Sequence, residues 1–112
     1  MQENDAFELY DIKVDVINNG LKPMVCNHKE GDSFLLSGEN FSLPNSQSFP
    51  IYCLAALLPI ITVKQRMTDV NDWITTDHEI ACPDIHCGGV FKISRLGKKT
   101  FYRHQVTATR PL

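Results

Sequence analysis

Apolar and polar residues alternate most regularly near the start of the chain, over residues 9–17. Ile12, Val14 and Val16 alternate with Asp11, Lys13 and Asp15, so one face of this segment is apolar and the other polar. A period of two residues is typical of a strand that is buried on one side. The turn-forming residues Asn18-Asn19-Gly20 follow it. The pattern therefore predicts a strand over 9–17.

A second apolar segment, residues 51–67, has helical spacing instead. Its apolar residues lie on more than one side of a helix, which predicts a single central helix that is largely buried. Ser48 is the expected N-cap, and Pro50 suits the first turn, where its missing N–H costs nothing. Pro59 is expected to kink or end the helix, because it cannot donate to the carbonyl four residues back.

Shorter apolar stretches between turn signals predict four more strands, over 33–37, 78–82, 90–96 and 101–107. Gly97-Lys98-Lys99 is expected to form a hairpin turn between the last two. Together these elements predict an α+β fold, with a small, mainly antiparallel sheet packed on one central helix. We expect a single domain over 1–112, with a polar N-terminal arm at 1–8 and an extra C-terminal strand or tail at 97–112.

Composition and charge narrow the functional classes. The chain has 112 residues, 43% of them hydrophobic, and a formal net charge of -2. Without a basic face it is not expected to bind nucleic acid. No apolar run approaches the roughly 20 residues that cross a bilayer, so no membrane association is expected. The start of the chain is polar and acidic, unlike a signal peptide, which predicts a cytoplasmic protein.

The cysteines are the main candidates for chemistry, and in a reducing cytoplasm we expect them to be free thiols. Thiolate and imidazole groups are the preferred ligands of zinc. Candidate ligands occur in two turn-like segments and are Cys26, His28, Cys82, His86 and Cys87. The alternatives are a redox disulfide between Cys82 and Cys87, or a buried Cys82 beside exposed loop histidines.

The remaining cysteine, Cys53, falls in the first turn of the predicted helix. Backbone N–H groups and the helix dipole favour a thiolate there, which would lower its pKa and make it a candidate catalytic nucleophile. His28 or His86 is the candidate base. The alternative is a small apolar side chain on the packing face of the helix.

Several motifs occur in an order that resembles one known family. They are Val25-Cys26-Asn27-His28-Lys29-Glu30-Gly31-Asp32-Ser33-Phe34, then Phe49-Pro50-Ile51-Tyr52-Cys53, Trp73, Ala81-Cys82-Pro83-Asp84 and Val90-Phe91-Lys92-Ile93. The chain resembles, over roughly residues 9 to 96, a family of small uncharacterised prokaryotic proteins with a Cys…Gly-Asp-x-Phe opening, an aromatic-Cys helix start and a closing Cys-Pro-Asp…Val-Phe-Lys-Ile strand. Asn27 stands where the family usually has Pro. The resemblance implies the fold outline and three cysteine landmarks, Cys26, Cys53 and Cys82, but no activity.

No phosphate loop, dinucleotide fingerprint or serine nucleophile motif occurs in the sequence. We therefore expect a small soluble, non-enzymatic binding or accessory protein. It would form a homodimer, or join a protein partner, through the C-terminal strand, because a long exposed edge strand tends to pair. The alternative is a thiol- or metal-dependent enzyme, or a structural zinc domain, that uses Cys26, Cys53 and Cys82.

Overall fold

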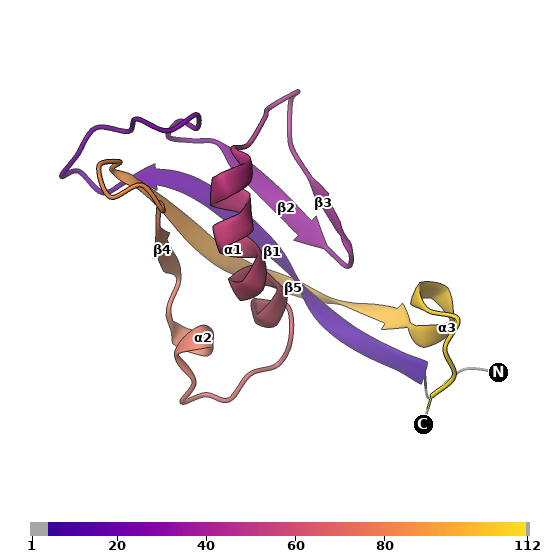
Figure 1. The fold of residues 1–112 in the computed structure, drawn as a ribbon. Coiled ribbons are helices and arrows are strands. Elements are labelled where there is room, and N and C mark those ends of the chain that lie inside the picture. Colours follow the sequence, from indigo (N-terminus) through magenta and orange to yellow (C-terminus); the bar gives the residue numbers. More distant parts are fainter. Residues whose placement is uncertain (1–4, 112) are drawn as a thin grey trace.

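The computed structural model describes residues 5–111, which form an α+β fold with an open, five-stranded antiparallel sheet and three short helices (Figure 1). Residues 1–4 of the predicted N-terminal arm, and Leu112, lie outside the described residues. The strand order is β3-β2-β1-β5-β4. The elements are β1 (Ala6–Asn18), β2 (Ser33–Ser37), β3 (Asn40–Ser42), α1 (Ile51–Lys64), α2 (Trp73–Thr76), β4 (Glu79–Ala81), β5 (Gly89–Tyr102) and α3 (Arg103–Val106).

The two longest strands, β1 and β5, form the centre of the sheet. They pair antiparallel from Ala6 opposite Tyr102 to Asn18 opposite Gly89, with a register shift between Tyr10 and Ile12. The predicted hairpin turn at 97–99 is wrong, because β5 continues through these residues. The first half of β1 supplies the pairing partner that keeps this part of β5 extended.

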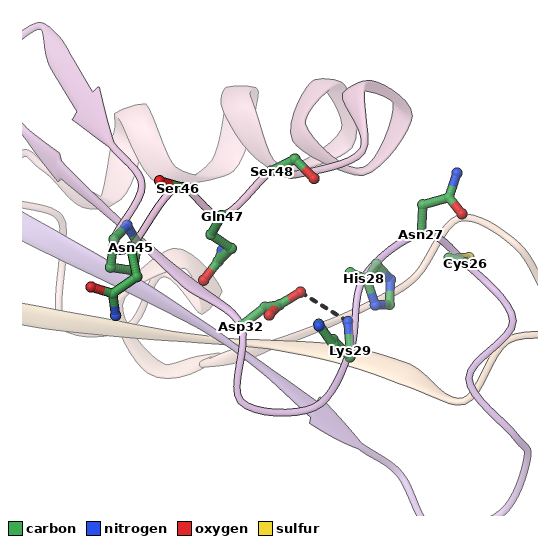
Figure 2. A pocket seen from close by; sticks show the side chains of 10 residues that line it. Cys26, Asn27, His28, Lys29, Asp32, Asn45, Ser46, Gln47 and Ser48 are labelled. Carbon is green, nitrogen blue, oxygen red and sulfur yellow. Dashed lines mark hydrogen bonds between the residues drawn. The ribbon is translucent and has the colours of Figure 1, made fainter.

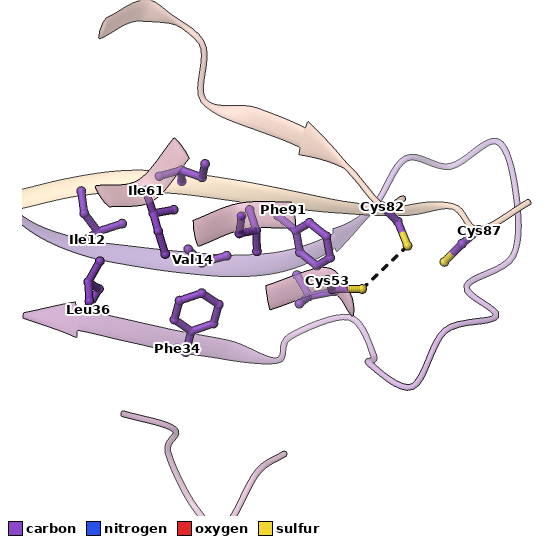
Figure 3. Packing of buried hydrophobic residues seen from close by; sticks show 12 residues of the cluster. Ile12, Val14, Phe34, Leu36, Cys53, Ile61, Cys82, Cys87 and Phe91 are labelled. Atoms are coloured by element: carbon purple, nitrogen blue, oxygen red, sulfur yellow. Dashed lines mark hydrogen bonds between the residues drawn. The ribbon is translucent and has the colours of Figure 1, made fainter. Parts of the chain in front are cut away.

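The core lies between one face of this sheet and α1 (Figure 3). Ile12, Val14 and Val16 of β1 are buried, as their alternation predicts. Phe34 of β2 and Phe91 of β5 extend the same apolar layer, and their rings both pack on Phe49. Burial of each large apolar side chain stabilises the fold by about 1.5–3 kcal/mol.

Helix α1 differs from the prediction at both ends and in its burial. It continues past Pro59, whose exposed position leaves the carbonyl of Ala55 free to bond water. The N-cap is Pro50 rather than Ser48, with no side-chain hydrogen bond. Only Cys53, Leu57, Ile61 and Lys64 of the helix are buried. The single chain therefore does not confirm a largely buried helix.

The C-terminal end of α1 is fixed to the sheet by Arg95 of β5. Its guanidinium donates to the carbonyl oxygens of Lys64 (2.8 Å) and Arg66 (2.9 Å), and it lies 4.6 Å from the ring centre of Tyr10. The buried ammonium group of Lys64 donates to the carbonyl oxygen of Ile74 in α2. These bonds satisfy the carbonyls at the end of the helix and hold α2 against it.

Candidate metal centre

Two loops meet at one end of the sheet, and the candidate ligands come from both. The first, residues 19–32, follows β1, and the second, residues 82–88, joins β4 to β5. The backbone N–H of Asn19 donates to Gly88 O (2.8 Å), and that of Gly88 donates to Pro23 O (2.9 Å). A Cβ atom at Gly88 would collide with the carbonyl oxygen of Lys22, so only glycine permits this approach.

The loops bring together four of the predicted ligands, Cys26, His28, Cys82 and Cys87, which we call the Cys/His cluster. One donor atom from each lies within 4.8 Å of all the others. The Sγ atoms of Cys26 and Cys82 are 3.1 Å apart. Ligand atoms around a tetrahedral zinc ion with thiolate bonds of about 2.3 Å are about 3.8 Å apart, so small side-chain movements would suffice. The cluster is therefore within metal-binding distance.

His28 is the only member of the cluster that contributes a nitrogen atom. Its side chain is only 5% exposed, yet neither Nδ1 nor Nε2 has a hydrogen-bond partner among the described residues. The ring packs edge-on against Phe91, with 5.2 Å between ring centres. Burial lowers its pKa, which favours the neutral imidazole that binds metals. A neutral imidazole can bind a metal through either nitrogen, so a buried His28 without a protein partner fits the role of a metal ligand.

Gly89 provides the space that this imidazole occupies. A Cβ atom at this position would lie 2.5 Å from Cε1 of His28 and 3.4 Å from Sγ of Cys87. The sequence analysis expected Gly88-Gly89 to help His86 and Cys87 bind one metal. The structure uses the two glycines for close approach of the first loop and of His28.

The thiols of the cluster differ in pKa. Burial and the neighbouring Cys82 and Cys87 raise the pKa of Cys26. Burial acts the same way on Cys87, but hydrogen bonds from the backbone N–H groups of Gly89, Val25 and Cys26 outweigh it and lower the pKa of Cys87 to about 7. A thiolate held by backbone N–H groups is a prepared metal ligand, and a bound cation would also favour the thiolate form of its neighbours.

Cys53 lies beside the cluster rather than within it. Its Sγ atom, at the start of α1, is 4.0 Å from that of Cys82 (Figure 3). Burial and the neighbouring Cys82 raise its pKa to about 12, opposite to the lowering expected from a helix N-terminus. An apolar opening of about 370 Å³ reaches Cys26, Cys53 and Cys82 from outside, between Tyr52 and Pro83.

A second, more polar pocket of about 630 Å³ lies on the other side of Cys26 and His28 (Figure 2). Asp32 closes one wall by accepting a hydrogen bond from the backbone N–H of Lys29 (2.9 Å). The opposite wall includes Asn45 and Ser46, which both adopt left-handed backbone conformations, with φ of 53° and 59°. Sequence analysis missed these two residues, although the run Pro44-Asn45-Ser46 consists of turn-forming residues.

The structure does not bring His86 into the cluster. This residue is exposed in the second loop, where its backbone N–H donates to the side chain of Asp84 (2.9 Å). All four cysteines, Cys26, Cys53, Cys82 and Cys87, are free.

Comparison of the chain with models of known protein families, with curated proteins and with solved structures finds no match. Among residues 5–111, no helix has the length and apolar character needed to cross a membrane.

Proposed function

We propose that the chain is a small, non-enzymatic zinc protein of the cytoplasm, in which the Cys/His cluster holds one structural Zn²⁺ ion. The observation that carries this proposal is the position of His28: it is buried, both its ring nitrogens lack partners, and it lies among three sulfur atoms. Three thiolates and one imidazole form a complete tetrahedral set of the kind found in structural zinc sites.

The donor chemistry supports zinc over harder cations. Magnesium and calcium prefer oxygen ligands, whereas thiolate and imidazole donors select zinc or another soft metal. The cluster offers one nitrogen and three sulfurs, and no carboxylate belongs to it. A reducing cytoplasm would keep the three thiols of the cluster available for such an ion.

In this proposal the ion fastens two loops that are far apart in the sequence. Cys26 and His28 come from the loop after β1, whereas Cys82 and Cys87 flank the turn before β5. Because the binding energy is available only when both loops are in place, it adds to the free energy of unfolding. Four protein ligands leave no open position for a substrate, which favours a structural role over a catalytic one.

The family resemblance is consistent with this proposal and is itself part of it. Its three cysteine landmarks, Cys26, Cys53 and Cys82, are far apart in sequence but close in space. Cys82 Sγ is 3.1 Å from that of Cys26 and 4.0 Å from that of Cys53. We infer that members of that family would share a sulfur-rich site at this end of the sheet.

Elemental analysis of the untagged protein tests the proposal, together with the absorption spectrum after cobalt substitution. We expect one zinc ion per chain, and a thiolate-to-cobalt charge-transfer band in the cobalt form. The variants Cys82→Ser and His28→Ala should lose the metal. The control His86→Ala changes an exposed histidine of the loop that carries Cys82, and it should keep the metal. A protein that binds no zinc, or in which His28→Ala binds as tightly as His86→Ala, would overturn the proposal.

A second candidate function is a thiol- or metal-dependent enzyme that uses Cys53. The observation that favours it is the apolar opening that reaches Cys26, Cys53 and Cys82. Timed alkylation of the zinc-loaded protein distinguishes the two functions, with Cys53→Ala as the control. Labelling of Cys53 faster than a free thiol at neutral pH would support the enzyme, and slow labelling would leave only the structural function.

A further inference from the structure

Helix α1 has an apolar face that the chain itself does not cover. No residue from 51 to 63 is charged, so the helix is apolar on every side. Its inner side packs on the sheet, and its outer face is formed by Ile51, Tyr52, Ala55, Leu58, Pro59 and Val63, all exposed. Tyr52 is 81% exposed. Helices that are apolar on all sides are normally buried on all sides.

A groove of about 720 Å³ runs alongside this helix on the same side of the sheet. One wall is formed by Leu54, Leu58 and Ile61 of α1. The other comprises residues of the β2–β3 hairpin, the ends of β1 and β5, and α3, which Figure 1 shows extending beyond α1. The groove reaches residues 101–107, which the sequence analysis expected to contact a partner.

The charge of the groove restricts what can occupy it. Among the described residues that line the groove, only Glu39 and Arg66 are charged, and their charges have opposite signs. The groove therefore carries no net charge and is more apolar than polar, which suits an uncharged helix better than an acidic peptide or a nucleic acid. A helix that lies on a membrane usually carries Lys and Arg along its polar face, and residues 51–63 of α1 have none.

We propose that a second copy of this chain occupies the groove. Helix α1 of each copy then lies in the groove of the other copy. This two-fold arrangement places the two α1 helices side by side between two sheets. Each helix then packs its inner side on its own sheet and its outer face on the partner's sheet. One contact made twice covers both apolar surfaces, as expected for an isologous dimer.

The exposed apolar area is adequate for such a dimer. Its main contributors are Ile51, Tyr52, Leu58, Val63, Phe7 and Phe41. From exposed fractions and areas of 150–250 Å² for an aromatic side chain, Tyr52, Phe7 and Phe41 alone offer roughly 330 Å² per chain, and the three aliphatic residues add to it. The smaller residues of the same face and groove bring this towards the about 800 Å² per partner of a standard stable interface.

Light scattering of the full chain, at about 50 µM and thus well above a micromolar Kd, tests the proposal. We expect twice the chain mass of 12.7 kDa. Leu58→Glu, where the outer face meets the groove and 42% exposed, should give a monomer. The control Val70→Glu places the same charge at a site that is 75% exposed but outside the face, and it should remain dimeric.

Circular dichroism tests whether each variant is folded. If Leu58→Glu is unfolded, Val63→Lys takes its place. A monomeric wild-type chain would overturn the proposal. If such a monomer bound neutral phosphatidylcholine vesicles, the apolar face would be a membrane-binding surface instead. A dimer that survives both Leu58→Glu and Val63→Lys would overturn it as well, because its interface would then lie elsewhere. The proposal does not depend on zinc, since neither the outer face nor the groove includes a cluster residue.

Discussion

At the Cys/His cluster, a candidate metal centre, individual residues act chiefly through the space that they fill or leave free. Gly89 is the clearest case, because its missing side chain leaves room for both the imidazole of His28 and the sulfur of Cys87. The ring of His28 is in turn fixed by Phe91 on its other side. The geometry of the cluster therefore depends on a residue that binds nothing itself.

Gly89→Ala tests this dependence. The new methyl group would lie 2.5 Å from the ring of His28, so the ring must leave the position that it has in the cluster. We expect a loss of about 1–3 kcal/mol in the free energy of unfolding, as for other overpacked sites. Zinc affinity should fall at least about tenfold, as when a supporting group is lost. Urea denaturation and a zinc competition titration measure the two effects.

The matched control is Gly97→Ala in the same strand, where an added Cβ meets nothing within 4 Å. This change should leave zinc affinity unaltered and change stability by less than about 1 kcal/mol. Equal effects of the two alanines on zinc affinity would contradict the role given to Gly89.

The buried side chain of Lys64 should make the stability of the protein depend on pH. Burial, and then the nearby Arg95, lower its pKa below the usual 10.5, and Asp77 only partly compensates. Lys64→Met removes a buried charge and should stabilise the protein by about 1 kcal/mol at pH 7, net of the lost bond to Ile74.

Between the lowered pKa and 10.5 the unfolded chain binds more protons than the folded one, so the stability of the wild type rises with pH. The advantage of Lys64→Met should therefore shrink as the pH is raised from 7 towards 10. Urea denaturation of both proteins at several pH values measures this difference. A constant difference would show that Lys64 titrates normally.

Much of the site could be predicted from residue types. Cys26, His28, Cys82 and Cys87 were candidates because zinc prefers their donor atoms, and the structure brings the four together. The separation of His86 from the other candidates could not be predicted, because it depends on how one turn is oriented by Asp84. The proximity of Cys53 to Cys82 was also hidden, since it requires α1 to pack on a particular part of the sheet.

At the scale of secondary structure, the ends of β1 and β5 form a two-stranded ribbon beyond the rest of the sheet (Figure 1). Residues 6–10 pair only with 98–102, whereas Ile12 to Asp15 pair with both β5 and β2. Two strands alone are marginally stable in water. The ribbon should therefore open more often than the centre of the sheet.

Hydrogen exchange measures this difference. Backbone amides of residues 98–102 should exchange at least about tenfold faster than those of residues 91–95, because local opening exposes them without unfolding the core. The measurement is best made at a protein concentration at which light scattering finds a monomer, so that no partner covers the ribbon. Equal protection of the two segments would contradict the prediction.

The sequence predicted those elements in which the spacing of apolar residues follows directly from which side of the element is buried. The strands at 9–17 and 33–37 and the helix starting at Ile51 are of this kind. It failed at 97–107, where Gly97 and two lysines resemble a turn but form part of β5, and where α3 then replaces the predicted last strand. Here the pairing with β1, about 90 residues away in the sequence, determines the conformation rather than local propensity.

For the whole molecule, a structural zinc ion predicts a large effect of metal on stability. At a free zinc concentration of about 1,000 times the Kd, binding contributes about 4 kcal/mol. For a chain of this size that corresponds to a rise in Tm of roughly 15 °C. Differential scanning calorimetry with zinc and with a chelator measures the shift, and Cys82→Ser should show almost none. The same Tm in zinc and in chelator would contradict a structural ion.

The order β3-β2-β1-β5-β4 also has a consequence for biosynthesis. The central strand pair joins residues near opposite ends of this sequence, so β1 leaves the ribosome long before its principal partner exists. Until residue 102 has been synthesised, β1 has only β2 beside it and α1 has little of its sheet to pack on. Cys26 and His28 must likewise wait for Cys82 and Cys87. The nascent chain therefore has to remain unaggregated, with its apolar helix exposed, until synthesis of β5 allows the sheet and the cluster to form together.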